Sequence, residues 1–173
     1  MTLANDLLEQ ARILAKREPQ RPKQASLRRA VSTAYYALFH LLVEAASREV
    51  VRGNNHRGLR EAVARSLNHG DMKKVCRSIA NWNPQKPPVP IATLLGGPPC
   101  AELVSLSQAF FELQQARHEA DYDLSMRFSR DEVTELIDIA ESAFSDFNAL
   151  RRDSRQYRTF MMALMFHPGW SRV

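Results

Sequence analysis

Apolar residues recur every three or four positions along most of this chain, which is the spacing of one face of an α-helix. No segment shows the strict alternation of apolar and polar residues that would indicate a β-strand. We therefore predict helices over these ranges: 3–18, 25–50, 56–69, 71–79, 101–123 and 130–151, with a last helical segment over 154–166.

Prolines and glycines mark the predicted ends of these helices. Pro19 ends the first helix, and the Gly-Asn-Asn sequence at 53–55 separates the second helix from the third. We expect Gly70 to stop the third helix and Asp71 to cap the short helix that follows.

Residues 81–99 have a different composition, with six prolines and a Gly-Gly pair that exclude a regular helix through most of the span. A connection of this length in a compact domain is usually functional or mobile. Trp82, Ile91, Leu94 and Leu95 need burial, so the segment is either an ordered insertion or a lid.

Two features describe the C-terminal third of the chain. Ser129 is followed three residues later by Glu132, which is the pattern of a capping box at a helix start. Residues 160–166 are apolar around the whole circumference of a helix, so we expect them to be buried against the bundle or a second subunit.

These patterns predict an all-α fold, an up-and-down bundle of four to five helices plus a C-terminal helix. At 173 residues the chain suits one domain, which we place at 1–153, followed by an apolar helix and tail at 154–173. Cys76 and Cys100 lack ligand-like spacing, so we expect neither a disulfide framework nor a metal site.

The distribution of charge and hydropathy suggests a location and a type of partner. No apolar run approaches the roughly 20 residues that cross a bilayer, so we expect a cytoplasmic protein without membrane contact. Residues 1–100 carry a net charge of +9 and residues 101–173 carry −4. This asymmetry favours either a polyanion such as nucleic acid or simply a solvated basic face. The basic residues form two blocks: Arg12, Lys16, Arg17, Arg21, Lys23, Arg28 and Arg29, then Arg48, Arg52, Arg57, Arg60, Arg65, Lys73, Lys74 and Arg77.

One polar stripe crosses the otherwise apolar helix predicted over 25–50. Arg29, Thr33, Tyr36 and His40 follow at three- and four-residue steps, so they lie on neighbouring turns. Such a stripe on a buried helix must face a partner, a pocket or a groove. We assign Arg29 and Tyr36 to nucleic-acid binding, whereas His40 is either a core histidine with satisfied hydrogen bonds or a site residue.

A second candidate segment lies near the end of the helix predicted over 101–123. Arg117 and Asp121 have the spacing of a helix salt bridge, and His118 and Tyr122 have the spacing of a stacked pair. In the structural explanation, these residues only stabilise the helix. The functional explanation makes Arg117, His118 and Tyr122 site residues whose long side chains converge near the helix end.

The two segments together resemble the HEPN family of small helical domains associated with RNA and nucleotides. The resemblance rests on Ala-Tyr-Tyr-Ala-Leu-Phe-His at 34–40 and Arg-His-Glu-Ala-Asp-Tyr-Asp at 117–123, and it spans roughly residues 1–150. It implies a homodimer in which motifs from two copies meet and cut RNA without a metal or other cofactor. Arg117 matches the family's arginine and His118 its polar neighbour.

Tyr122 stands where the family pattern has a histidine. A phenol, with a reference pKa near 10, exchanges protons poorly near neutral pH, so the general acid–base role falls to another residue. His40 is the first candidate and His118 the second, followed by His56 and His69 on the basic segment. Whether the chain is an enzyme therefore stays open.

We expect an RNA- or nucleotide-binding protein, with Arg48 and Arg52 as further nucleic-acid contacts and a metal-independent ribonuclease of toxin–antitoxin or defence type as its activity. The alternative from the resemblance is a non-catalytic module that partners a cognate minimal nucleotidyltransferase, with Tyr122 as the residue that is modified. A third possibility is a scaffold in which residues 161–166 join two chains.

Overall fold

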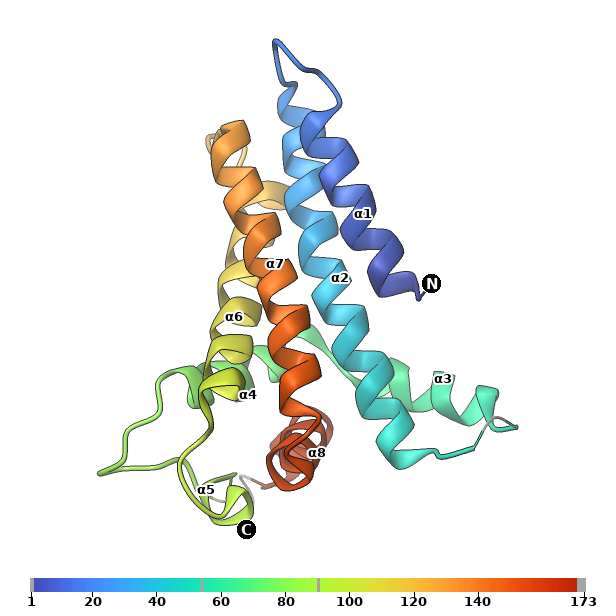
Figure 1. Cartoon of the computed structure of the whole chain (residues 1–173), viewed down its shortest axis with the longest axis vertical. Helices are drawn as coiled ribbons and strands as arrows, with labels where there is room; N and C mark the ends of the chain where they lie inside the picture. The colour runs from blue at the N-terminus through green and yellow to red at the C-terminus, as the bar shows by residue number, and fades with distance from the viewer. Residues whose placement is uncertain (1, 54, 90, 171–173) are drawn as a thin grey trace. The chain divides into compact units, whose positions relative to one another are not determined.

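The computed structural model describes residues 2–53, 55–89 and 91–170, except for the side chains of residues 154 and 167–170. Across these residues the chain forms helices and no strands, which confirms the predicted all-α fold class (Figure 1). The chain divides into two compact units: unit 1 is Met1–Leu41 with Ala109–Ser145, and unit 2 is Leu42–Gln108 with Asp146–Val173.

Unit 1 contains α1 (Leu3–Lys16) and parts of α2 (Gln24–Val50), α6 (Ala101–Tyr122) and α7 (Arg130–Leu150). Figure 1 shows α1 beside the first half of α2. The helices pack through the faces that the apolar periodicity predicted. The core of unit 1 includes Leu8, Leu27, Val31, Tyr35, Leu38, Phe110, Leu113, Val133 and Ile137.

Arg28 of α2 closes the C-terminal end of α6. Its guanidinium donates to the backbone carbonyls of Ala120 and Asp123, both at 2.8 Å, and also to that of Met126. The last carbonyls of a helix have no partner within the helix, and a cation there also meets the negative end of the helix dipole. Arg28, which the sequence placed in a basic block suited to a polyanion, thus directs its donors into the protein.

Arg130 plays the same part at the end of α1. It donates to the carbonyls of Ala15 at 3.2 Å and Pro19 at 2.7 Å, and also to that of Glu18. Arg130 therefore fixes the start of α7 to the end of α1. Arg130 belongs neither to a basic block of the sequence nor to the candidate site residues.

Unit 2 contains α3 (Arg57–Ser66), α4 (His69–Ala80), α5 (Ile91–Leu95) and α8 (Ser154–Trp170), with the remaining parts of α2, α6 and α7. α8 packs against both α4 and α5. Both cysteines are free thiols, as their spacing predicted. The core of unit 2 includes Leu42, Met72, Val75, Ile79, Ile91, Leu103, Leu106, Phe160 and Met161.

Side chains of α8 hold the proline- and glycine-rich connection. Arg155 and Thr159 both donate to the carbonyl of Leu94, at 3.1 and 3.2 Å. Gln156 accepts from the backbone N–H of Cys100 at 2.8 Å. Gly96 has φ +77°, and a Cβ there would lie 2.4 Å from Cζ of Arg155. Glycine at 96 therefore serves both the left-handed backbone and the close approach of the guanidinium.

The structure corrects several predicted boundaries and one predicted burial. Gly70 does not stop a helix and Asp71 is not a cap, because Asn68 is the N-cap of α4 and its Oδ1 accepts from the backbone N–H of Asp71 at 2.9 Å. α5 adds a short helix inside the 81–99 connection. The predicted burial of residues 160–166 is wrong at two positions, because Met162 is 40% and Phe166 43% exposed.

The capping box at the start of α7 is confirmed. The backbone N–H of Ser129 donates to Glu132 at 2.7 Å, and that of Glu132 donates to Oγ of Ser129 at 3.2 Å. The backbone N–H and the hydroxyl of Ser129 lower the pKa of the Glu132 carboxyl, because hydrogen bonds to the carboxylate favour its charged form. The pattern predicted this contact because both partners are local in sequence.

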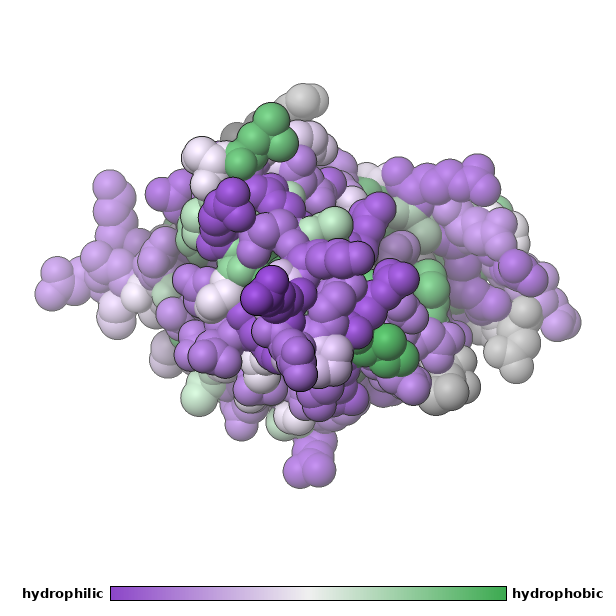
Figure 2. Space-filling model, turned by 90° about the horizontal axis from the view of Figure 1, so that it is seen from above, coloured by the Kyte–Doolittle hydropathy of each residue, from purple (hydrophilic) through white to green (hydrophobic). Residues whose placement is uncertain are grey.

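In the part of the chain that the structure describes, no helix combines the length and apolarity needed to span a membrane. The face drawn in Figure 2 is mostly hydrophilic, with isolated hydrophobic side chains. Apolar residues scattered singly in this way are normal on a protein surface and indicate no site by themselves.

Candidate functional site

Arg117, near the C-terminal end of α6, is held by two groups of unit 1. Its Nη2 donates to the hydroxyl of Tyr36 on α2 at 3.0 Å. Its Nε lies 2.7 Å from Oδ2 of Asp121, but Nε makes no aligned hydrogen bond, so Asp121 holds the guanidinium by charge. Asp121 is anchored in turn, because its Oδ1 accepts from the buried hydroxyl of Ser32 at 2.5 Å.

Arg117 and Asp121 form a partly buried ion pair, with side chains 19% and 25% exposed. Partial burial lowers the pKa of Arg117, but contacts with Tyr36, Asp121 and Tyr122 raise it by more, so the pKa lies above its usual value. The guanidinium therefore stays charged, and reduced contact with water makes this pair stronger than an exposed one.

Two tyrosine rings flank the same guanidinium. Cζ of Arg117 lies 5.5 Å from the ring centroid of Tyr36 and 5.5 Å from that of Tyr122, which is cation–π distance for both. The Tyr122 ring lies 5.1 Å from that of His118, and the Tyr36 ring 6.3 Å from that of His40. One aromatic and cationic cluster therefore joins all five side chains, which we call the Arg117 cluster.

His40 is the half-buried end of the Arg117 cluster. Burial lowers its pKa, because desolvation disfavours the charged imidazolium. A histidine with a lowered pKa is neutral at pH 7. His118, by contrast, is exposed on α6.

An open depression of about 700 Å³ lies at the exposed end of the cluster. Tyr122 and Leu124 stand out from its wall with 63% and 92% of their surface exposed. The lining residues are Gln115, His118, Glu119, Tyr122, Asp123, Leu124 and Ser125.

One guanidinium nitrogen of Arg117 takes part in none of the contacts described above. The described contacts of the guanidinium use Nε and Nη2, and none uses Nη1. The Arg117 side chain is 19% exposed, so it is not closed off from solvent. An arginine held in this way can bind an oxyanion without losing its position.

Comparisons with protein families, curated proteins and solved structures find no match to this chain. Among the described residues, no group of three or more histidine, cysteine or acidic side chains is placed to hold a metal ion.

The structure separates the residues that the sequence grouped on one stripe. Tyr36 contacts Arg117 directly and His40 contacts Tyr36. Arg29 is exposed, and the buried hydroxyl of Thr33 donates to the carbonyl of Arg29 at 2.6 Å, so neither is among the cluster's contacts. The predicted nucleic-acid contacts Arg48 and Arg52 belong to unit 2, whereas the Arg117 cluster belongs to unit 1.

Sequence reasoning missed Ser32 as a site residue and gave Asp121 only a structural role. Ser32, Tyr36 and His40 follow at steps of four, so they form a row on one face of α2. This row, rather than the one through Arg29 and Thr33, faces α6. Choosing between the two adjacent rows required the position of α6.

Proposed function

We propose that this chain is a HEPN-like RNA-binding protein that holds a phosphodiester at Arg117 and cleaves RNA without a metal ion. The observation that carries the proposal is the anchoring of Arg117, whose Nε and Nη2 engage Asp121 and Tyr36 while 19% of the side-chain surface stays exposed. A fixed guanidinium binds phosphate oxygens by charge-assisted hydrogen bonds and stabilises the charge that develops on them during cleavage.

The exposed rings beside Arg117 suit the bases of single-stranded RNA. Tyr122 is 63% exposed and lines the depression together with His118. Unstacked bases bind to aromatic side chains with about 1–3 kcal/mol per base. Phosphate at Arg117 and a base against Tyr122 are therefore compatible, because the Tyr122 ring already lies beside the guanidinium.

The proton-transfer role in this proposal falls to His118. Imidazole is the side chain suited to exchanging protons near neutral pH. His118 lines the depression, whereas His40 is half-buried with a lowered pKa. His40 therefore supports Tyr36 from the inner side of the cluster.

The test is binding and cleavage of a labelled single-stranded RNA in the presence of chelator. We expect Arg117→Ala to weaken binding about 10- to 100-fold, the loss of one charged hydrogen bond. Its cleavage rate should fall about 100- to 1000-fold, the cost of losing one donor to a developing oxyanion.

Arg152→Ala is the matched control, because Arg152 is exposed and its replacement removes the same charge from unit 2. Arg117→Lys keeps the charge and tests the guanidinium geometry, while circular dichroism confirms folding of each variant. Equal binding by wild type and Arg117→Ala would contradict the site, and binding without cleavage at high protein concentration would remove the nuclease activity from the proposal.

The proposed activity includes a homodimer, because the resemblance places the motifs of two copies together. Cleavage per molecule should then fall on dilution, in step with the mass measured by light scattering. Undiminished cleavage by a monomer would show that one copy suffices.

A second candidate function is that of a module modified by a nucleotidyltransferase. The observation that favours it is the 63% exposure of Tyr122, which leaves its side chain open to another enzyme. Co-expression with a minimal nucleotidyltransferase encoded beside this chain should add a nucleotide mass to the peptide containing Tyr122. An unmodified peptide from a co-purified complex would contradict this function, and Tyr122→Phe is the control for the position.

A further inference from the structure

The net charge of the chain is concentrated in one segment of unit 2. Residues 48–77 contain eight Lys and Arg against three Asp and Glu, which gives +5, and this equals the net charge of the whole chain. The remaining residues therefore sum to zero. This segment runs from the end of α2 through α3 and α4 and lies within unit 2.

α3 buries none of its ten residues, although the sequence pattern predicted an apolar face. Leu59, the first residue of that face, is 59% exposed. Isolated helices shorter than about 12–15 residues are marginal in water, so α3 depends on local contacts. Glu61 supplies two of them, an ion pair with Arg57 at 2.8 Å and one with Arg65 at 3.9 Å.

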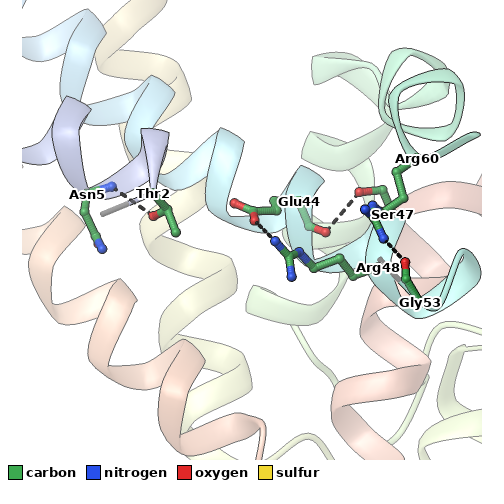
Figure 3. A network of polar contacts seen from close by, with 7 residues as sticks. All are labelled: Thr2, Asn5, Glu44, Ser47, Arg48, Gly53 and Arg60. Carbon is green, nitrogen blue, oxygen red and sulfur yellow. Dashed lines mark hydrogen bonds and ion pairs between the residues drawn. The ribbon is translucent and has the colours of Figure 1, made fainter. Parts of the chain in front are cut away.

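A further arginine of α3 is bonded to the turn between α2 and α3. Arg60 donates to the carbonyl of Gly53, which has φ +86° (Figure 3). Figure 3 also shows Arg48 at the end of α2, where it pairs with Glu44 at 2.7 Å. We call Arg48, Arg52, Arg57 and Arg65 the basic arm.

The arginines of the basic arm remain available to a ligand although each has a carboxylate neighbour. The side chains of Arg48, Arg52, Arg57 and Arg65 are 63%, 72%, 88% and 81% exposed. Exposed ion pairs are worth about 0–1 kcal/mol, so an incoming phosphate exchanges with them at little cost. Guanidinium groups also bind phosphate through two parallel hydrogen bonds.

We propose that the basic arm is a second RNA-binding surface that contacts the phosphate backbone without reading sequence. That the bound polyanion is RNA rests on the proposed function. The position of the binding surface rests only on the exposed arginines of the basic arm. Membrane-surface helices need a wide apolar face with large residues. α3 exposes Leu59 as its large apolar side chain and contains no aromatic residue, so nucleic-acid phosphate fits this surface better than a lipid surface does.

The test measures the affinity of the full chain for a 20-nucleotide single-stranded RNA as a function of salt. Each phosphate contact contributes about 0.7 to the slope of log affinity against log salt on single strands. We expect Arg57→Gln combined with Arg65→Gln to lower the slope by about 1.4. We expect Glu61→Gln to tighten binding, because it frees both arginines, and a merely structural role for Glu61 gives no such gain.

The matched control is Lys86→Gln combined with Arg152→Gln, which removes two exposed charges outside residues 48–77. If the salt slope falls equally for both double variants, the proposed role of the basic arm is wrong. Weaker RNA binding by Glu61→Gln would also contradict it. Arg117→Ala separates the two proposals, because adding Arg57→Gln and Arg65→Gln to it should still lower the slope by about 1.4. Wild-type binding to phosphatidylserine vesicles without binding to RNA would assign the arm to membranes and overturn the proposal. If single-stranded DNA of the same sequence binds as tightly as the RNA, the result supports a contact with the phosphate backbone.

Discussion

Replacing Tyr35 by alanine is expected to lower the free energy of unfolding by about 3–5 kcal/mol, the usual cost of truncating a large buried aromatic side chain. Tyr35 is fully buried, and its ring lies 5.6 Å from that of Phe110 and 6.0 Å from that of Phe39. A cavity at this position would open between α2 and α6, the helices that carry the Arg117 cluster. Urea unfolding followed by circular dichroism measures the change.

The adjacent tyrosine provides the contrast. Tyr36→Phe keeps the ring beside Arg117 and removes only the hydroxyl that accepts from Nη2. We expect it to cost about 1 kcal/mol of stability or less and to weaken RNA binding. Equal destabilisation by the two changes would show that the Tyr-Tyr pair is one structural unit rather than a core residue beside a site residue.

Arg28→Ala is expected to destabilise the protein by about 2–3 kcal/mol, because it removes charged hydrogen bonds to three carbonyls beyond and within the last turn of α6. Hydrogen exchange of the amides of residues 118–123 should accelerate at the same time, because this end of α6 loses its cap. Denaturant unfolding and exchange measured on the same samples check the two effects together.

Arg29→Ala is the control for this change, since it removes the same charge one residue along α2. The side chain of Arg29 is exposed, so its loss should alter stability by no more than about 0.5 kcal/mol. Comparable destabilisation by the two variants would mean that net charge, and not the capping of α6, sets the stability of unit 1.

Much of the fold followed from local sequence because apolar periodicity and the α7 capping box depend on residues close along the chain, although distant arginines close the ends of α1 and α6. The capping box at Ser129 and the apolar periodicity of α1, α2, α6 and α7 are examples. α3 shows where this reasoning fails: its apolar residues have helical spacing, but Leu59 is 59% exposed. The periodicity reports a helix, whereas burial also depends on a neighbouring element.

The candidate site was predictable only in part for a similar reason. The Arg117–Asp121 ion pair follows from spacing along one helix. The contact between Arg117 and Tyr36 joins residues 81 positions apart, so it depends on how α2 and α6 pack. Asp121 received a structural role from its spacing, yet it positions the arginine of the site through its own bond to Ser32.

In unit 1, arginines of two helices cap the C-terminal ends of two other helices. Arg130 of α7 secures the end of α1, while Arg28 of α2 secures the end of α6. Gln24 adds a two-way link, because its amide donates to the carbonyl of Phe128 at 2.7 Å and accepts from the N–H of Phe128 at 3.0 Å. Fraying at any one terminus therefore breaks bonds in a second helix. We expect these ends to open as a single cooperative foldon whose amides share one opening free energy, which native-state hydrogen exchange measures.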